Sequence, residues 1–469
     1  MQQVHERFDC DLAILGGGSA GYAAARTGVA AGLRTVVIEA GAEVGGLCIL
    51  HGCMPTKALL HAAEIMQHAR RVAAWGVHAG NVGFDFAEVM ARKNAVVAGF
   101  AADRRGQLAG SAFKFVRAHA AFLDPHTVAL SGQGTLSSLS AAHFVIATGS
   151  AVALPHLRGL SDVDYLTSDD ALKLTALPES LIVLGGGAVS IEFAQFFARF
   201  GVHVSILQRS EHLLSAFDPD VATEVERIFR RDGLDVFTGT ELIDARSEGR
   251  QKTVAFLHHG QPGSVSAAAI LLAAGRKPNT ASLDLDRAGV TTEGGRIVAN
   301  EFMQTSATHI YTAGDCTGPH QVVHLAVQQG EAAAHNIAHP NSLRHIDERL
   351  ALAVIFIEPQ VACVGLSERL AATRNVPYLS AVHPFSDLGK ALIMGATDGF
   401  VKLLANPQSG EILGAACIGP YGGELIHEIV VAIAKRMSVH ELAALPHYHP
   451  TLAEIWTYPA ATLAARTQA

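Results

Sequence analysis

The chain has 469 residues, of which 49% are hydrophobic, and it carries a net charge of −8 and six cysteines. At roughly 100–200 residues per domain, this length predicts about three domains. The acidic balance argues against nucleic acid as a partner, no apolar run approaches the ~18 residues that a membrane span needs, and six cysteines are too few for a disulfide scaffold. We therefore expect a soluble, cytoplasmic, globular protein with no nucleic-acid or membrane partner.

A glycine-rich motif stands near the start of the chain. Residues 8–15 predict a buried strand, and a helix is predicted over 22–32. Between them, three glycines have the spacing G-x-G-x-x-G: Gly16, Gly18 and Gly21. Glycines at this spacing let the backbone approach a pyrophosphate, whose charge the helix N-terminus stabilises. A second predicted strand, 35–38, ends at Glu39, which can accept hydrogen bonds from an adenosine ribose, so the segment predicts a dinucleotide site.

Two cysteines separated by four residues, Cys48 and Cys53, lie just past this site. Two thiols beside a bound dinucleotide, able to form a disulfide, suggest electron transfer to or from sulfur. The same spacing could supply half of a zinc site, but structural zinc normally takes four ligands in closely spaced pairs. Because the other four cysteines are scattered singly, we predict no metal.

The glycine pattern recurs in the middle of the chain. The apolar run 181–184 leads into Gly185, Gly187 and Ser190, and a helix followed by a strand is predicted over 191–207. Serine in the third position is small enough for the helix to pack closely on the strand. The segment therefore predicts a second dinucleotide site.

The two copies differ at the position that contacts the ribose. Glu39 lies 23 residues after the first glycine of its motif, and the matching residue of the second copy is Gln208, followed by Arg209. A carboxylate repels a 2′-phosphate, whereas an arginine can pair with one. We therefore expect NADPH to be favoured over NADH at the second site; the alternative is that Arg209 is a solvated surface charge.

Five segments carry a resemblance to a known family. In chain order they are 45–57, 146–150, 273–279, 310–315 and 449–454. Together with the two glycine motifs, their order resembles the class I pyridine nucleotide–disulfide oxidoreductases, which include dihydrolipoyl dehydrogenase, glutathione reductase and mercuric reductase. The resemblance extends along nearly the whole chain. The C-terminal motif is most similar to that of dihydrolipoyl dehydrogenase.

The resemblance implies an α/β fold with two Rossmann-like dinucleotide-binding domains, for FAD and NAD(P), and a C-terminal α+β dimerisation domain. The implied divisions are 1–150 for the first part of the FAD domain, 151–272 for the NAD(P) domain, 273–345 for the central segment that completes the FAD domain, and 346–469 for dimerisation. The implied assembly is a homodimer. In the last segment, the apolar stretch 350–357 predicts a buried strand.

The same resemblance assigns catalytic roles. Cys48 and Cys53 would form a redox-active disulfide, with Cys53 nearer the flavin and Cys48 exchanging with substrate sulfur. His449, from the other subunit, would be the acid/base, and Glu454 would fix its tautomer. His447 lies two residues earlier but is not the expected acid/base, because only His449 has the H-P-T-x-x-E context.

Further residues are implied to bind the cofactors. On the FAD side these are Gly16, Gly18, Gly21, Glu39, Gly46, Lys57, Ala120, Thr148, Gly149 and Asp315. On the NAD(P) side these are Gly185, Gly187, Ser190, Glu192, Gln208, Arg209, Gly275 and Arg276. Lys57 would lie near the flavin ring and pair with Glu192.

The chain departs from the family pattern in places. Leu47 replaces the usual threonine before Cys48, and His51 stands where a small apolar residue is usual. The end of the chain, 464–469, has no vicinal cysteine pair, so capture of a soft metal is not expected. The sequence is best interpreted as that of an enzyme that transfers electrons between NAD(P)H and a small disulfide or dithiol. The alternatives are an NAD(P)H-dependent reductase of quinones or other small oxidants, and a flavin-based redox sensor.

Overall fold

The computed structural model describes residues 8–110, 112–132, 137–318 and 320–467. Residues 1–7 of the predicted first domain, and residues 468–469 of the chain end discussed above, lie outside these ranges. The chain divides into two compact units, which are described separately. Unit 1 comprises residues 1–58, 90–153 and 275–346, and unit 2 comprises residues 59–89, 154–274 and 347–469.

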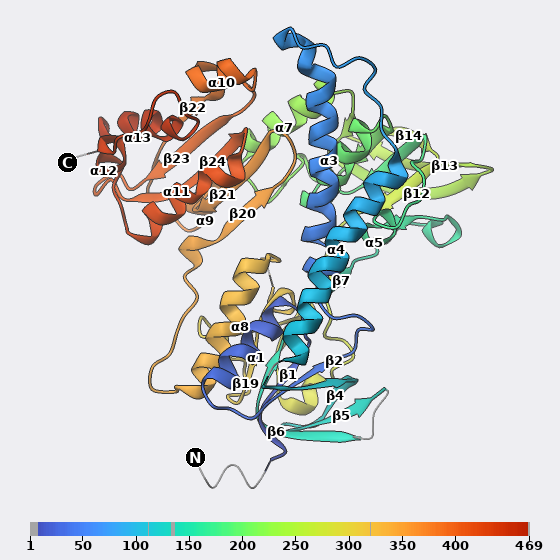
Figure 1. Ribbon diagram of the computed structural model, residues 1–469, viewed down its shortest axis with the longest axis vertical. Helices are drawn as coiled ribbons and strands as arrows, with labels where there is room; N and C mark the ends of the chain where they lie inside the picture. The colour runs from blue at the N-terminus through green and yellow to red at the C-terminus, as the bar shows by residue number, and fades with distance from the viewer. Residues whose placement is uncertain (1–7, 111, 133–136, 319, 468–469) are drawn as a thin grey trace. The chain divides into compact units, whose positions relative to one another are not determined.

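Unit 1 is built on a seven-stranded sheet with a parallel core (Figure 1). The central strand β1 (Cys10–Leu15) pairs in parallel with β2 (Thr35–Glu39) and β6 (Ser138–Ile146), and β19 (Ile310–Thr312) pairs with β6. All six residues of β1 are buried, as expected for a central parallel strand that is covered on both faces. The sheet is completed by β3 (Lys114–Arg117), β4 (His119–Asp124) and β5 (Thr127–Ser131).

Helix α1 (Ser19–Ala30) packs against α8 (Val323–Ala338) in unit 1. The contact is backbone to backbone, because a Cβ added at Gly330 would overlap the carbonyl oxygen of Ala20. The remaining elements of this unit are α2 (Gly46–Leu50), β7 (Ser150–Val152), β16 (Arg276–Pro278), β17 (Thr292–Glu293), β18 (Arg296–Ile297) and the 3-10 turns Leu285–Ala288 and Asp315–Thr317. The boundaries between the units fall within α3 (Cys53–Arg71) and α4 (Phe86–Ala109).

Unit 2 contains a second parallel sheet, in the order β11-β10-β9-β15-β8. Its strands are β8 (Leu166–Thr167), β9 (Ser180–Leu184), β10 (His203–Leu207), β11 (Asp235–Phe237) and β15 (Ala269–Leu272). The helices of this region are α5 (Ser168–Ala171), α6 (Ala188–Arg199) and α7 (Pro219–Arg231). An antiparallel meander follows, formed by β12 (Thr240–Glu248), β13 (Gln251–His258) and β14 (Gln261–Ala267). Two further 3-10 turns, Val72–Trp75 and Leu160–Asp162, belong to this unit.

The C-terminal part of unit 2 is an antiparallel five-stranded sheet with helices, in the order β20-β21-β24-β23-β22. The strands are β20 (Leu352–Ile355), β21 (Gln360–Gly365), β22 (Leu379–Pro384), β23 (Phe400–Ala405) and β24 (Ile412–Gly419). The helices are α9 (Glu368–Thr373), α10 (Gly389–Met394), α11 (Gly422–Ala434), α12 (Val439–Ala444) and α13 (Thr457–Ala464), with 3-10 turns at Glu348–Leu350, Phe385–Asp387 and Ala453–Trp456. Two parallel nucleotide-type sheets and a C-terminal α+β region confirm the predicted fold class.

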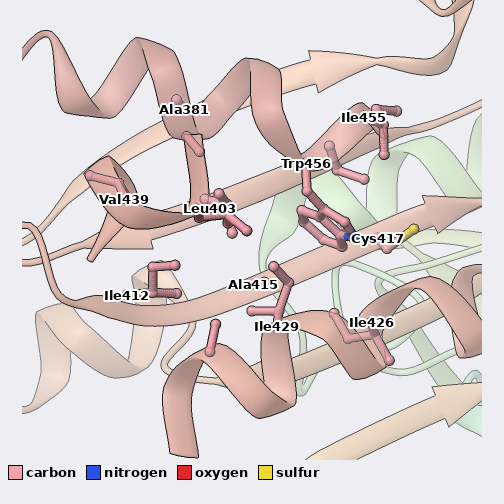
Figure 2. Close-up of a cluster of buried hydrophobic side chains, with 14 of the residues drawn as sticks. Ala381, Leu403, Ile412, Ala415, Cys417, Ile426, Ile429, Val439, Ile455 and Trp456 are labelled. Carbon is pink, nitrogen blue, oxygen red and sulfur yellow. The ribbon is translucent and has the colours of Figure 1, made fainter. Parts of the chain in front are cut away.

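Trp456 is the largest fully buried side chain of this C-terminal core (Figure 2). It packs among buried aliphatic residues such as Leu403, Ile426 and Ile429. Its indole N–H donates to the carbonyl oxygen of Leu425 at 3.0 Å, which satisfies the one polar atom of the ring. The core therefore fixes the chain two residues after Glu454.

The expected buried strand over 350–357 is wrong in its extent and burial. Strand β20 covers only Leu352–Ile355, lies at the edge of the sheet, and buries only Ile355 fully. The residues after it turn toward helix α6, where the Phe356 amide donates to Glu192 Oε1 at 2.9 Å. Apolar composition predicted a strand here, but the edge position and these contacts set its end.

A buried lysine lies at the centre of three carboxylates in unit 2. Lys402 Nζ donates to Asp218, Asp220 and Glu368 at 2.8–3.0 Å, and only 1% of the lysine side chain is exposed. Burial alone would lower the pKa of Lys402, but these hydrogen bonds raise it. The ammonium group therefore stays charged and joins α7, α9 and β23.

We expect Lys402→Met to lower the free energy of unfolding by about 3–5 kcal/mol, because it leaves buried Asp218 without its cation. A thermal unfolding midpoint well below that of the wild type would show this. The control is Lys435→Met, at an exposed lysine, which should change stability by less than about 0.5 kcal/mol. Equal midpoints for the two variants would contradict the prediction.

Among the described residues, we find no helix that is both long and apolar enough to cross a membrane.

Candidate active site

The first glycine loop has a tight backbone and one open position. Gly16 adopts φ 108°, and a Cβ there would overlap the carbonyl oxygen of Ala147. A Cβ at Gly21 would overlap the carbonyl oxygen of Gly16, and one at Gly46 would lie 2.7 Å from Gly18 Cα. Gly18, by contrast, has no atom within 3.9 Å of its added Cβ. The first and third glycines are thus needed for packing, and the second leaves space beside the N-terminus of α1, where a phosphate can bind.

Glu39 stands at the end of β2, directly beside this loop. Its two carboxylate oxygens accept hydrogen bonds at 2.7 Å from the amides of Gly17 and Gly41. The carboxylate therefore fixes the loop, in addition to the ribose contact that the sequence predicts for it. Each oxygen keeps a further lone pair for another donor.

Hydrogen bonds between polar side chains link the segment that follows β6 to the segment that follows β19 in unit 1. Ser150 Oγ donates to Asp315 Oδ2 at 2.6 Å, and the Arg276 guanidinium donates to both Ser150 Oγ and the Ser150 carbonyl at 2.7–2.8 Å. Predicted cofactor residues Asp315 and Arg276 are thus brought together through Ser150. Ser150 is the last residue of the motif 146–150 but was not predicted as a site residue. The available signal was its position directly after Gly149.

Other residues that were predicted to bind a cofactor also lie in unit 1. Gly149 and Gly275 have open space where a side chain would be, and both have positive φ. Thr148 immediately precedes Gly149, and Ala120 is half-buried in β4. The open glycines and the loop at Gly18 fit the FAD that the resemblance implies: they would leave room for its phosphates and let the backbone approach it.

The two predicted redox cysteines lie on two consecutive helices, and both belong to unit 1. Cys48 lies in α2, Cys53 is the first residue of α3, and both are thiols in this structure. A hydrogen bond to Cys53, together with burial, raises the pKa of Cys48, and the positive charge of Lys57 opposes that shift. Cys53 lies at the N-terminus of α3, where the helix dipole favours an anion.

The second glycine loop, in unit 2, repeats the backbone of the first. Gly185 has φ 117°, and a Cβ there would overlap the carbonyl oxygen of Ala273, as at Gly16 and Ala147. Gly187 has nothing within 4 Å of an added Cβ. Ser190 is fully buried and donates from Oγ to the Ala273 carbonyl at 2.9 Å. The serine thus permits close packing, as predicted, and adds a hydrogen bond that a glycine lacks.

The residues that follow β10 differ in exposure. Gln208 is half-buried, and its side chain reaches the carbonyl of His212 at 3.5 Å. Arg209 is exposed, and the described residues contribute no ion pair to it. Glu192, on α6, is buried and accepts from the Phe356 amide.

The C-terminal histidine and glutamate form the predicted pair. His449 Nδ1 lies 2.9 Å from Glu454 Oε2; the histidine side chain is 73% exposed and the glutamate 10%. The Thr451 amide donates to the other carboxylate oxygen at 3.2 Å, which holds the glutamate in place. Nε2 of His449 is therefore left for an external partner, with Nδ1 as the donor to Glu454.

His447 has a different environment. Its Nε2 lies 2.8 Å from Glu428, its Nδ1 lies 3.1 Å from the Leu445 carbonyl, and only 10% of its side chain is exposed. Both ring nitrogens are used inside the fold. The two histidines therefore differ in exposure: the His447 ring is largely buried and the His449 ring is largely exposed.

Comparison with known proteins gives a consistent result. Residues 10–330 match the family described as pyridine nucleotide-disulphide oxidoreductase, and residues 352–460 match its dimerisation domain, which supports a homodimer. A mercuric reductase of Streptomyces lividans is 36% identical over 472 residues, covering 100% of this chain and 97% of that protein. A dihydrolipoyl dehydrogenase of Chlamydia pneumoniae is 33% identical over 453 residues, covering 96% of each.

Solved structures are similar over the whole chain. LpdA from Mycobacterium tuberculosis has 27% sequence identity and a TM-score of 0.87, with 97% of this chain and 99% of that chain covered. The HOCl-induced flavoprotein disulfide reductase RclA from Escherichia coli has 27% identity and a TM-score of 0.84, with 96% and 99% covered. This chain therefore belongs to the class I pyridine nucleotide–disulfide oxidoreductases, FAD-dependent enzymes that use a pyridine nucleotide.

Proposed function

We propose that this enzyme transfers electrons between NADPH and a small disulfide or dithiol substrate through Cys48 and Cys53, as a dihydrolipoyl dehydrogenase-like protein. The observation that carries the proposal is the His449–Glu454 pair, with one ring nitrogen bound to a buried carboxylate and the ring largely exposed. Such a pair serves a reaction in which a thiol gains and loses a proton. Bound FAD would accept a hydride from the nucleotide and deliver electrons to sulfur.

The dithiol would act in two exchange steps. Cys48, as a thiolate, attacks one sulfur of the substrate disulfide and forms a mixed disulfide, and the first substrate thiol leaves with a proton. Cys53, as a thiolate, then attacks Cys48, which releases the second substrate thiol and forms the Cys48–Cys53 disulfide. The hydrogen bond between the two thiols supports this division of roles, because it keeps the proton on the cysteine that must exchange it.

His449 would take the proton of Cys48 and give it to the leaving substrate thiol. Glu454 would hold the tautomer in which Nε2 is free to do so. We propose that His449 of one protomer serves the dithiol of the second protomer, as the dimerisation domain and the exposure of the ring favour.

The nucleotide preference rests on Gln208 and Arg209. No carboxylate follows β10 directly, and the exposed guanidinium is a suitable partner for a 2′-phosphate. The relatives named above include a mercuric reductase and a dihydrolipoyl dehydrogenase. We propose a disulfide as the acceptor because the Cys48 and Cys53 thiols and the His449–Glu454 pair suit thiol–disulfide exchange.

Anaerobic titration of the purified holoenzyme tests the proposal. We expect about one equivalent of NADPH to produce a long-wavelength charge-transfer absorbance, which reports a Cys53 thiolate against oxidised flavin, and to produce it faster than NADH does. The visible spectrum recorded at each addition checks this. Bleaching of the flavin without that absorbance would show that the dithiol is not coupled and would contradict the proposed function.

A further inference from the structure

We propose that His259 is a second specificity residue of the nucleotide site: it binds the 2′-phosphate of NADPH together with Arg209 and holds Glu211 away from it. This inference rests on the proposed use of NADPH and deepens it. It arises from three turns of unit 2 that meet at one end of the parallel sheet.

Backbone hydrogen bonds join the first two turns. The Gln208 amide donates to the Phe237 carbonyl at 2.8 Å, and the Thr240 amide donates back to the Gln208 carbonyl at 3.0 Å. The Gly239 amide donates to the Ser210 carbonyl at 2.8 Å. The segment that carries Arg209 is therefore held against the β11–β12 connection.

The third turn places His259 against Gly239, in the β11–β12 connection. His259 and Gly260 form the two-residue connection of the β13–β14 hairpin, because His258 pairs with Gln261. Both central residues have positive φ, 49° and 80°, as in a type I′ turn, where asparagine or glycine is usual at the first position. The His259 amide donates to the Gly239 carbonyl at 3.3 Å. A Cβ at Gly239 would lie 2.6 Å from His259 Cε1, so the imidazole lies against the bare face of that glycine.

Proteins retain a left-handed backbone at a non-glycine residue chiefly where the surrounding structure or the function requires it. Asparagine would satisfy this turn with less strain. The hairpin instead presents an imidazole next to the loop of Arg209, where it adds a nitrogen donor suited to a phosphate.

The charges nearby explain why a second donor is useful. Glu211 lies two residues after Arg209, and its carboxylate would repel a phosphate. Glu211 Oε2 is 3.8 Å from His259 Nδ1, and both side chains are more than half exposed. The two neighbouring histidines have other contacts. His212 contacts Glu226 at 3.2 Å, and His258 packs edge-on to Phe237 at 5.6 Å and against the His259 ring at 4.5 Å. His259 is thus the imidazole placed to offset Glu211.

The experiment compares kcat/KM for NADPH and for NADH in the holoenzyme and four variants. We expect Arg209→Leu to lower the NADPH/NADH ratio by about tenfold or more, because a charge-assisted contact is lost. His259→Asn, which suits the turn but removes the imidazole, should lower the ratio by roughly threefold through NADPH alone, and Glu211→Gln should raise it by a similar factor. The matched control is His203→Asn, at an exposed histidine at the opposite end of β10, which should leave the ratio unchanged.

The outcomes separate this inference from the function on which it rests. If Arg209→Leu leaves the ratio unchanged, the NADPH preference in the proposed function is wrong. If Arg209→Leu lowers the ratio while His259→Asn and Glu211→Gln both match the His203→Asn control, the role of His259 is overturned and the proposed function stands.

Discussion

Replacing Cys48 with serine is expected to lower disulfide-reductase turnover by roughly 10³-fold or more, because a serine hydroxyl cannot form the mixed disulfide. Reduction of the flavin by NADPH should continue at a rate close to that of the wild type, because Cys48 exchanges with substrate and not with nucleotide. Steady-state reduction of a small disulfide such as lipoamide, together with stopped-flow reduction of the flavin, measures the two steps separately.

The matched control is Cys363→Ser, in strand β21 of the C-terminal sheet. Burial raises the pKa of the Cys363 thiol to about 12, so this cysteine is an inert thiol at neutral pH. Folded Cys363→Ser enzyme should therefore reduce the disulfide at the wild-type rate. If Cys48→Ser reduced the disulfide as fast as the wild type, the exchange mechanism would be wrong, and a reductase of quinones or a redox sensor would become the better interpretation.

Replacing His449 with glutamine is expected to lower disulfide turnover by about 10²–10⁴-fold, the usual contribution of a general acid/base. Glutamine keeps polar atoms near the position of the ring but cannot exchange a proton. Flavin reduction by NADPH should change little, because that half-reaction does not use the acid/base. Steady-state turnover and stopped-flow flavin reduction measure the two effects separately.

His447→Gln provides the internal comparison two residues away. His447 uses both ring nitrogens within the fold, so its loss should lower the unfolding midpoint and leave turnover within about threefold of the wild type. Equal losses of turnover in the two variants would mean that His449 acts through the structure and not as a base. Glu454→Gln should resemble a weaker His449 variant, because it acts by positioning the ring.

Much of the candidate site could be predicted from sequence because backbone geometry demands particular residues there. Gly16 and Gly185 each lie against a carbonyl oxygen that excludes any side chain, so their spacing is visible in the sequence. The two carbonyl oxygens belong to Ala147 and Ala273, which directly follow strands β6 and β15. These contacts explain why the segments that contain the two alanines form recognisable motifs. The choice of His449 over His447 rested on the H-P-T-x-x-E context, which the resemblance to the family supplied.

Other features depend on contacts between distant segments and gave no local signal. Lys402 lies in an apolar strand, and its three carboxylate partners are 34–184 residues away in the chain. The early end of β20 depends on contacts with α6, and the position of His259 depends on a hairpin turn that packs against Gly239. Composition and periodicity describe one segment at a time, so they could not predict these contacts between distant segments.

The repetition of one loop backbone at two sites has a practical meaning for protein engineering. The two loops have the same tight first glycine and the same open second glycine, although their third residues are Gly21 and Ser190. We therefore expect nucleotide choice to depend on side chains outside the loops, at exposed turn tips such as 209, 211 and 259. Redesign of coenzyme use would then be confined to these tips and would leave the phosphate-binding backbone and the buried sheets untouched.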